Sequence, residues 1–217
     1  MKGELTMKRT KISLLATFFV FGIINLNGAW WANGFPCPYP FDSQCESLVA
    51  QGASSFLQSF SNFYLLLNES ELGSENETTG FNFVKANSSI ENTLNNLVTS
   101  RENLSQLLSL LKKSTIESTA IQKLKSFNYE TLVTTRNLHP RVMDRLKCFL
   151  YRGDLNGFLE EILSDLDSII THSIKIQESI QNNKIPSLDN LREIFQEFSD
   201  CMLFGYYASL VFSEIKE

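Results

Sequence analysis

The amino-acid sequence predicts an all-α fold, most simply a four-helix bundle with an additional short helical insertion. Two observations lead to this class. Apolar residues recur at spacings of three and four along most of the chain, which is the period of one helix face. No segment alternates apolar and polar residues between hairpin turns, so strands are not expected. Because a lone helix cannot hide an apolar stripe from water, we expect the helices to pack against one another.

The first 28 residues have the pattern of a secretory signal peptide. An uncharged run from Ile12 to Leu26 follows a basic segment that contains Lys2, Lys8, Arg9 and Lys11. This run is shorter than the roughly 20 residues that span a bilayer, and no second run of that length exists. We therefore expect cleavage near Gly28 or Ala29 and secretion of residues 29–217 as one extracellular helical-bundle domain without a membrane anchor. A retained anchor is the alternative.

The mature chain is acidic. Loss of residues 1–28 leaves 15 Lys and Arg against 23 Asp and Glu, so the formal net charge changes from −5 to −8. Nucleic acid is not an expected partner, because phosphate binding needs clustered Lys and Arg and we identify no such cluster. About 190 residues are enough for one domain with a single core.

Two helices are expected in the first half of the mature chain. Apolar residues at helical spacing predict the first over about residues 43–67, with Ser43 as its N-cap. The second is predicted over about 88–112, where Ser88 and Glu91 match a capping box. Residues 68–87 between them are polar and contain two glycines, which indicates a surface loop.

The second half predicts a helical insertion followed by the remaining helices. Weaker periodicity over 114–138, with many Thr and Asn residues, indicates short helices and turns. Pro140 can begin the next helix. Asp154 is the expected N-cap of the strongest helix, which ends before Pro186, and a last helix is expected over about 188–215.

All four cysteines lie in the mature chain: Cys37, Cys45, Cys148 and Cys201. An even count is typical of a chain folded in an oxidising compartment, so the domain is expected to contain two disulfides. Three pairings are open.

Four N-glycosylation sequons are present, at Asn68, Asn76, Asn87 and Asn103. The first three fall in the segment interpreted as a polar loop, which favours glycans there in a eukaryotic host. Asn103 lies beside the apolar stripe of the second helix and is a weaker candidate.

No catalytic, phosphate-binding or zinc-protease motif occurs, so an enzyme is not expected. Neither His139 nor His172 has a Cys, Asp or Glu at metal-ligand spacing. No metal, cofactor or small-molecule substrate is therefore predicted. The acidic pairs of the long helix are interpreted as a solvated face: Glu160 with Glu161, and Asp165 with Asp167.

The tripeptide Arg152-Gly153-Asp154 spells an integrin-binding motif. We interpret it structurally, because Gly at one helix end and Asp at the next helix start are common turn residues.

The last helix has aromatic residues on more than one face, which indicates burial in the bundle centre or else a partner surface. Its stretch from Phe198 through Cys201, Gly205 and Tyr206 to Ile215 resembles the final helix of the leukaemia inhibitory factor and oncostatin M cytokines. The resemblance implies a secreted signalling ligand that binds a cell-surface receptor through helix faces.

In that family a Phe and a Lys at the start of the last helix contact a receptor. Ile194 or Phe195 stands at the Phe position, whereas Glu197 or Phe198 occupies the neighbourhood of the Lys. The resemblance thus implies a receptor contact at Ile194, Phe195 and Phe198, with a departure at the Lys.

A second departure concerns helix order. Long-chain cytokines run up-up-down-down, which needs a long link before the last helix, whereas only residues 182–187 separate the last two helices here. A short link makes antiparallel neighbours.

The alternative function is a secreted helical-bundle inhibitor or binding module that acts on an extracellular protein. The segment Cys37 to Cys45 is similar to the Cys hairpin of plant invertase and pectin methylesterase inhibitors, which are up-down bundles. A Cys37–Cys45 disulfide favours this alternative, and pairing of either cysteine with Cys148 or Cys201 favours the cytokine.

Overall fold

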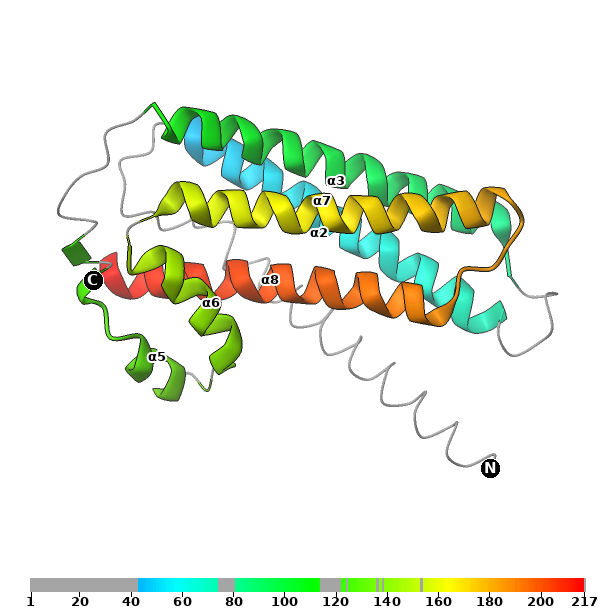
Figure 1. Cartoon of the computed structure of the whole chain (residues 1–217). Coiled ribbons are helices and arrows are strands. Elements are labelled where there is room, and N and C mark those ends of the chain that lie inside the picture. Colours follow the sequence, from blue (N-terminus) through cyan, green and yellow to red (C-terminus); the bar gives the residue numbers. More distant parts are fainter. Residues whose placement is uncertain are drawn as a thin grey trace. The chain divides into compact units, whose positions relative to one another are not determined.

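The computed structural model describes residues 43–73, 81–113, 122–123, 125–135, 137, 139–152 and 154–216. This part of the chain contains helices and no strands, with turns and short links between the helices, which confirms the all-α prediction. Its helices are α2 (Ser43–Gly73), α3 (Phe83–Leu111), α5 (Tyr129–Thr135), α6 (Pro140–Leu150), α7 (Leu155–Gln181) and α8 (Leu188–Lys216) (Figure 1). The expected signal peptide and Cys37 lie outside the described residues.

The first two helices are longer than the sequence pattern predicts. The loop expected over 68–87 is wrong at both ends, because α2 continues to Gly73 and α3 begins at Phe83. The N-cap of α3 is Asn82, whose side-chain oxygen accepts a hydrogen bond of 3.0 Å from the Lys85 amide. Ser88 of the expected capping box lies within the helix instead.

The starts of α6 and α7 agree with the prediction. Pro140 is the first residue of α6. The Asp154 carboxylate caps α7 by accepting a 2.8 Å hydrogen bond from the Gly157 amide, and a Cβ at Gly157 would collide with that carboxylate. The structural interpretation of Asp154 in the Arg-Gly-Asp tripeptide is therefore confirmed.

Each long helix runs antiparallel to the long helix before it (Figure 1). Within each pair of neighbouring helices, contacts nearer the end of one helix involve residues nearer the start of the other. The contacts that fix this order are Thr93 with Ser59 and Leu104 with Gly52 between α2 and α3, Arg101 with Asp167 and Lys112 with Glu160 between α3 and α7, and Ser168 with Glu197 and Phe158 with Phe204 between α7 and α8.

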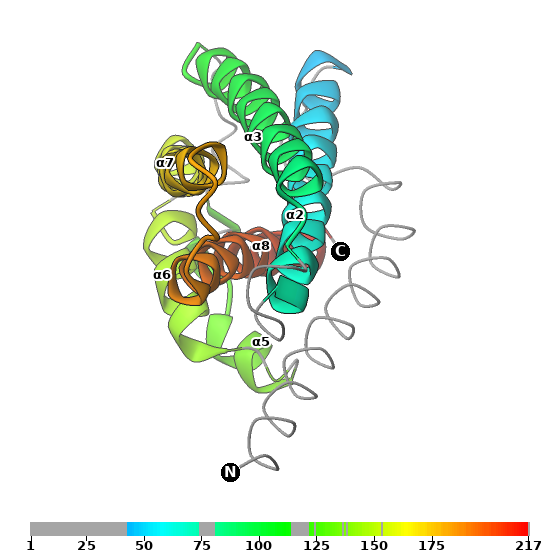
Figure 2. The same ribbon diagram turned by 90° about the vertical axis from the view of Figure 1, so that its right-hand side faces the viewer.

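Helix α2 meets its two neighbours in different ways. It approaches α3 so closely that a Cβ on Gly52 would lie 3.1 Å from the Leu104 side chain. Helix α2 instead crosses α8 at an angle (Figure 2), and phenylalanine rings from the two helices are in contact. The Phe198 ring centroid lies 5.4 Å from those of Phe56 and Phe63, and Phe63 and Phe198 are among the largest fully buried side chains.

Short helix α6 packs on α7 and α8 through its apolar face. Met143 and Leu146 are fully buried there. The hydroxyl of Tyr207 on α8 accepts a 2.8 Å hydrogen bond from the backbone amide of His139, which precedes α6. The start of α6 is thus fixed to α8. Among the described helices, none is both long enough and apolar enough to cross a membrane.

Candidate functional site

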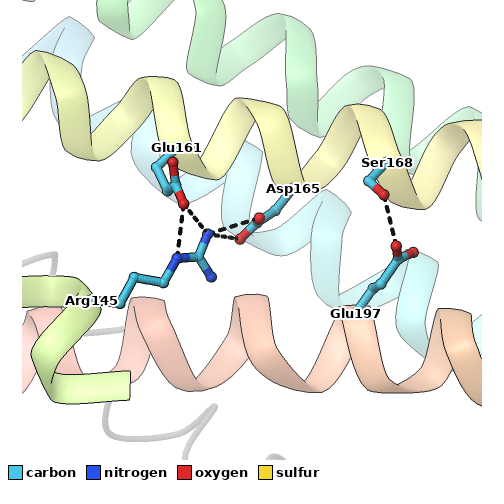
Figure 3. Close-up of polar contacts among 5 residues, drawn as sticks. All are labelled: Arg145, Glu161, Asp165, Ser168 and Glu197. Atoms are coloured by element: carbon cyan, nitrogen blue, oxygen red, sulfur yellow. Dashed lines mark hydrogen bonds and ion pairs between the residues drawn. The ribbon is translucent and has the colours of Figure 1, made fainter. Parts of the chain in front are cut away.

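The most concentrated polar contacts lie where α6, α7 and α8 meet, and Arg145 of α6 is at their centre (Figure 3). Its Nη2 lies 2.8 Å from both carboxylate oxygens of Asp165, and its Nε donates a 2.9 Å hydrogen bond to Glu161. The guanidinium carbon lies 4.6 Å from the ring centroid of Phe204 on α8. One arginine therefore links three helices by two ion pairs and a cation–π contact.

Burial and charge act in opposite directions on this group. Burial by itself lowers the pKa of Arg145, but the hydrogen bonds that its guanidinium donates to Asp165 and Glu161, together with the charges of these carboxylates, outweigh burial and raise it. For Asp165, burial raises the pKa and outweighs the opposing effect of Arg145. Arg145 therefore keeps its positive charge, whereas burial destabilises the negative charge of Asp165.

A second polar cluster joins α7 to α8 one helix turn further on. The Ser168 hydroxyl donates a 2.7 Å hydrogen bond to Oε1 of Glu197, and Nδ1 of His172 lies 3.0 Å from Oε2 of the same carboxylate. Ser168 and Glu197 are drawn in Figure 3. Ser168 and His172 each contact the carboxylate, so the imidazole is not placed to take the serine proton as in a catalytic triad. The cluster fastens two helices.

The cysteines require a correction. Neither Cys148 nor Cys201, the two cysteines whose side chains the structure describes, forms a disulfide. Cys201 is buried in α8, and burial raises the pKa of its thiol, so it is a poor nucleophile. Cys148 is exposed on α6. The expectation of two disulfides therefore fails for these two residues.

The structure places the expected receptor contacts in or beside the core. Ile194 and Phe198 are fully buried, and Phe195 is half-buried with its ring centroid 5.8 Å from that of Phe60. The helical period that brings these side chains together is the period of the core face. A receptor contact through Ile194 or Phe198 would require each side chain to leave the interior.

The sequons occupy different surroundings. Asn68 is exposed near the end of α2, and Asn76 lies outside the described residues. Asn87 and Asn103 are half-buried within α3. The Asn103 amide donates to the Thr99 carbonyl at 3.0 Å, and the side-chain oxygen of Asn87 is buried without a hydrogen-bond partner.

The polar side chains where α6, α7 and α8 meet are engaged in contacts between helices. In the described ranges, no three His, Cys, Asp or Glu side chains are grouped as metal ligands. Of the acidic residues interpreted as a solvated face, Glu160 and Asp167 are exposed as predicted, whereas Glu161 and Asp165 are half-buried. All four also form ion pairs with basic residues of α3, its C-cap or α6. These clusters hold α6 in place and leave its outer face toward solvent.

The sequence interpretation missed one feature of this region. Residues 112–152 contain nine of the 19 Lys and Arg residues of the chain but only three of its 24 Asp and Glu residues. A count of charge along the chain, rather than for the whole chain, is the signal that would have revealed it. In comparisons with known proteins, no family, curated protein or solved structure matches this chain.

Proposed function

We propose that the protein is an exported up-down-up-down four-helix bundle with a short helical insertion, which acts as a binding module on an extracellular protein. It works by surface contact and has no chemistry of its own. This is the inhibitor-like alternative rather than the cytokine-like one.

The order of the long helices favours the inhibitor-like alternative over the cytokine-like one. Successive long helices are antiparallel, and only residues 182–187 link α7 to α8. An up-up-down-down cytokine needs two long crossovers, one of them before its last helix. The long link of this chain instead separates α3 from α7 and contains α5 and α6. The helix order thus favours a simple up-down bundle.

The thiols support the same alternative. Because Cys148 and Cys201 are both free, the local pair Cys37 and Cys45 is the pairing that remains. We propose that these two cysteines close a loop in front of α2. Such a loop resembles the Cys hairpin of the plant inhibitors.

Export is tested on the full chain expressed in eukaryotic cells. The protein in the medium is analysed by mass spectrometry without reduction, which reports its first residue and its disulfides. We expect a chain that begins near Ala29 and contains a Cys37–Cys45 bridge. Retention of residues 1–28 in a membrane fraction would contradict export, and a bridge from Cys37 or Cys45 to Cys148 or Cys201 would return the choice to the cytokine.

Binding is tested with the protein purified from that medium and immobilised. We expect it to capture a protein from the extracellular fluid of its own organism, with loss of capture after the fluid is treated with protease. Binding to intact cells, lost after their surface proteins are removed, would instead support a receptor ligand. Turnover of a small molecule would overturn both.

A further inference from the structure

The outer face of α6 forms a ridge of exposed side chains that the helix contacts do not use. We call it the α6 ridge; it comprises Arg141, Asp144 and Cys148 of α6 with Tyr151 and Arg152 of the turn that follows it, and all five are exposed. The first four members are three or four positions apart, which places them on one side of the helix and its C-cap residue Tyr151, and Arg152 follows directly. The Tyr151 side chain is 60% exposed, although tyrosine usually buries much of its ring.

The two arginines of the ridge differ from the other basic residues of α6 in their ion pairing. Arg145 is taken by Asp165 and Glu161, and Lys147 lies 3.5 Å from Asp144. Arg141 and Arg152 have no ion-pair partner among the residues that the structure describes. Arg141 lies at the start of α6 and Arg152 two residues after its end, and this 11-residue helix is about 16 Å long.

The ridge is basic in an acidic protein. Three basic residues, Arg141, Lys147 and Arg152, lie on or beside it against the single carboxylate of Asp144, whereas the whole chain has a net charge of −5. A local positive region on a negative protein attracts an acidic partner and orients it, because the rest of the surface repels that partner.

We propose that the α6 ridge binds an acidic segment of the partner protein. The proposal rests on the proposed function and names the surface and the partner chemistry. An arginine guanidinium donates two parallel hydrogen bonds to a carboxylate, and Arg and Tyr are frequent anchors of protein interfaces. Arg141 and Arg152 each bind a carboxylate of the segment, and its apolar side chains cover Tyr151.

The ridge fits a protein better than a continuous polyanion. Asp144 stands between the two arginines and would repel an unbroken row of sulfates or phosphates. A protein segment avoids this repulsion, since it places its carboxylates only where the arginines are. The exposed ring of Tyr151 also offers apolar contact area that a polyanion backbone does not use.

The test measures fluorescence anisotropy with the protein purified from expressing cells. The probe is a labelled helical peptide with glutamates on one face and leucines on the other; a second peptide has lysines in place of the glutamates, and heparin is the polyanion. The variant Arg141→Glu with Arg152→Glu is compared with the matched control Lys175→Glu with Lys184→Glu. Both variants change the net charge equally at exposed positions, and thermal unfolding checks that both are folded.

We expect the glutamate peptide to bind and the lysine peptide not to bind. The arginine variant should lose affinity about tenfold or more, the control should stay within about twofold, and Tyr151→Ala should weaken binding with little change in its salt dependence. Equal loss in both double variants would overturn the proposal, since net charge alone would explain it. Tighter binding of heparin that depends on Arg141 and Arg152 would overturn it in favour of a polyanion. If the glutamate peptide does not bind but the protein still captures its partner, the ridge proposal fails and the proposed function stands.

Discussion

The Nδ1 atom of His172 on α7 lies 3.0 Å from Oε2 of Glu197 on α8. The other oxygen of that carboxylate accepts the hydrogen bond of Ser168. Both carboxylate oxygens are therefore used between helices, and the single carboxylate of Glu197 serves two side chains of α7.

We expect Glu197→Ala to lower the free energy of unfolding by about 1–2 kcal/mol, because two half-buried donors lose their acceptor. In a double-mutant cycle with His172→Ala, the two residues should couple by about 0.5–1.5 kcal/mol. Urea unfolding measures both values. Glu193→Ala, on the exposed side of the same helix, should change stability by less than about 0.5 kcal/mol. Strict additivity would contradict the shared contact.

Removal of the Arg145 side-chain charge should cost more than removal of a surface arginine. Arg145→Met leaves Glu161 and Asp165 half-buried without their cation, and we expect a loss of about 2 kcal/mol. Arg192→Met is the matched control, because Arg192 pairs with Asp189 at 3.3 Å with both side chains mostly exposed. Its loss should stay below about 0.5 kcal/mol. If both variants lose the same free energy of unfolding in chemical denaturation, the contacts of Arg145 with three helices stabilise the fold no more than a surface ion pair does.

Asp165 should give the protein a specific pH dependence. Burial raises the pKa of its carboxyl group above 3.8, so the folded state binds this proton more readily than the unfolded state. The stabilisation that protonation of Asp165 provides is fully present below its pKa in the unfolded state. It is lost as the pH rises through its pKa in the folded state. The stability of Asp165→Asn minus that of the wild type should therefore increase from acid to neutral pH. An opposite trend in unfolding measurements would mean that Arg145 outweighs burial.

Two helical glycines should respond differently to alanine. Gly205→Ala should raise the free energy of unfolding by about 0.5–1 kcal/mol, because a Cβ there meets no atom within 4 Å and alanine favours the helix. At Gly52 the Cβ would lie 3.1 Å from Leu104, so Gly52→Ala should gain less than Gly205→Ala. Gly52→Leu should lose about 1–3 kcal/mol or more by forcing α2 from α3. Thermal unfolding of the three variants checks this order, and an equal gain at both glycines would refute the close approach.

The two described thiols should differ in reactivity. Cys148 is exposed and should react with a maleimide in the native protein. Cys201 should react only after unfolding, because it is buried and its pKa is raised. Intact mass before and after denaturation counts the labels, with Cys148→Ser as the control that removes native labelling. Native labelling of Cys201, or protection of Cys148 until reduction, would contradict the structure.

Local chemistry explains which helix ends could be predicted. Pro140 and Asp154 act within a few residues of their own position, so the pattern of nearby side chains is sufficient to place the starts of α6 and α7. The start of α3 also carries a local signal, because Asn82 caps it, but the polar stretch offers a second capping pattern at Ser88 and Glu91. Polar residues there are compatible with the exposed side of a helix as well as with a loop.

The candidate site was less predictable than the fold. Glu161 and Asp165 had the spacing of one helix face, but no local pattern indicated that Arg145, in a different helix, would lie between them. The same limit applied to Ile194 and Phe198. A helical period identifies an apolar face without saying whether that face meets a receptor or the neighbouring helix.

The sequence alone determined the helical class and the positions of α6, α7 and α8, because the helical period and the caps are local properties of the chain. Tertiary structure decided which side chains meet. It placed Phe198 against the rings of α2, used the acidic residues of α7 to hold α3 and α6, sealed Cys201 and left Tyr151 in solvent. These outcomes depend on contacts between residues far apart in the chain, and the packing of several helices fixes them together.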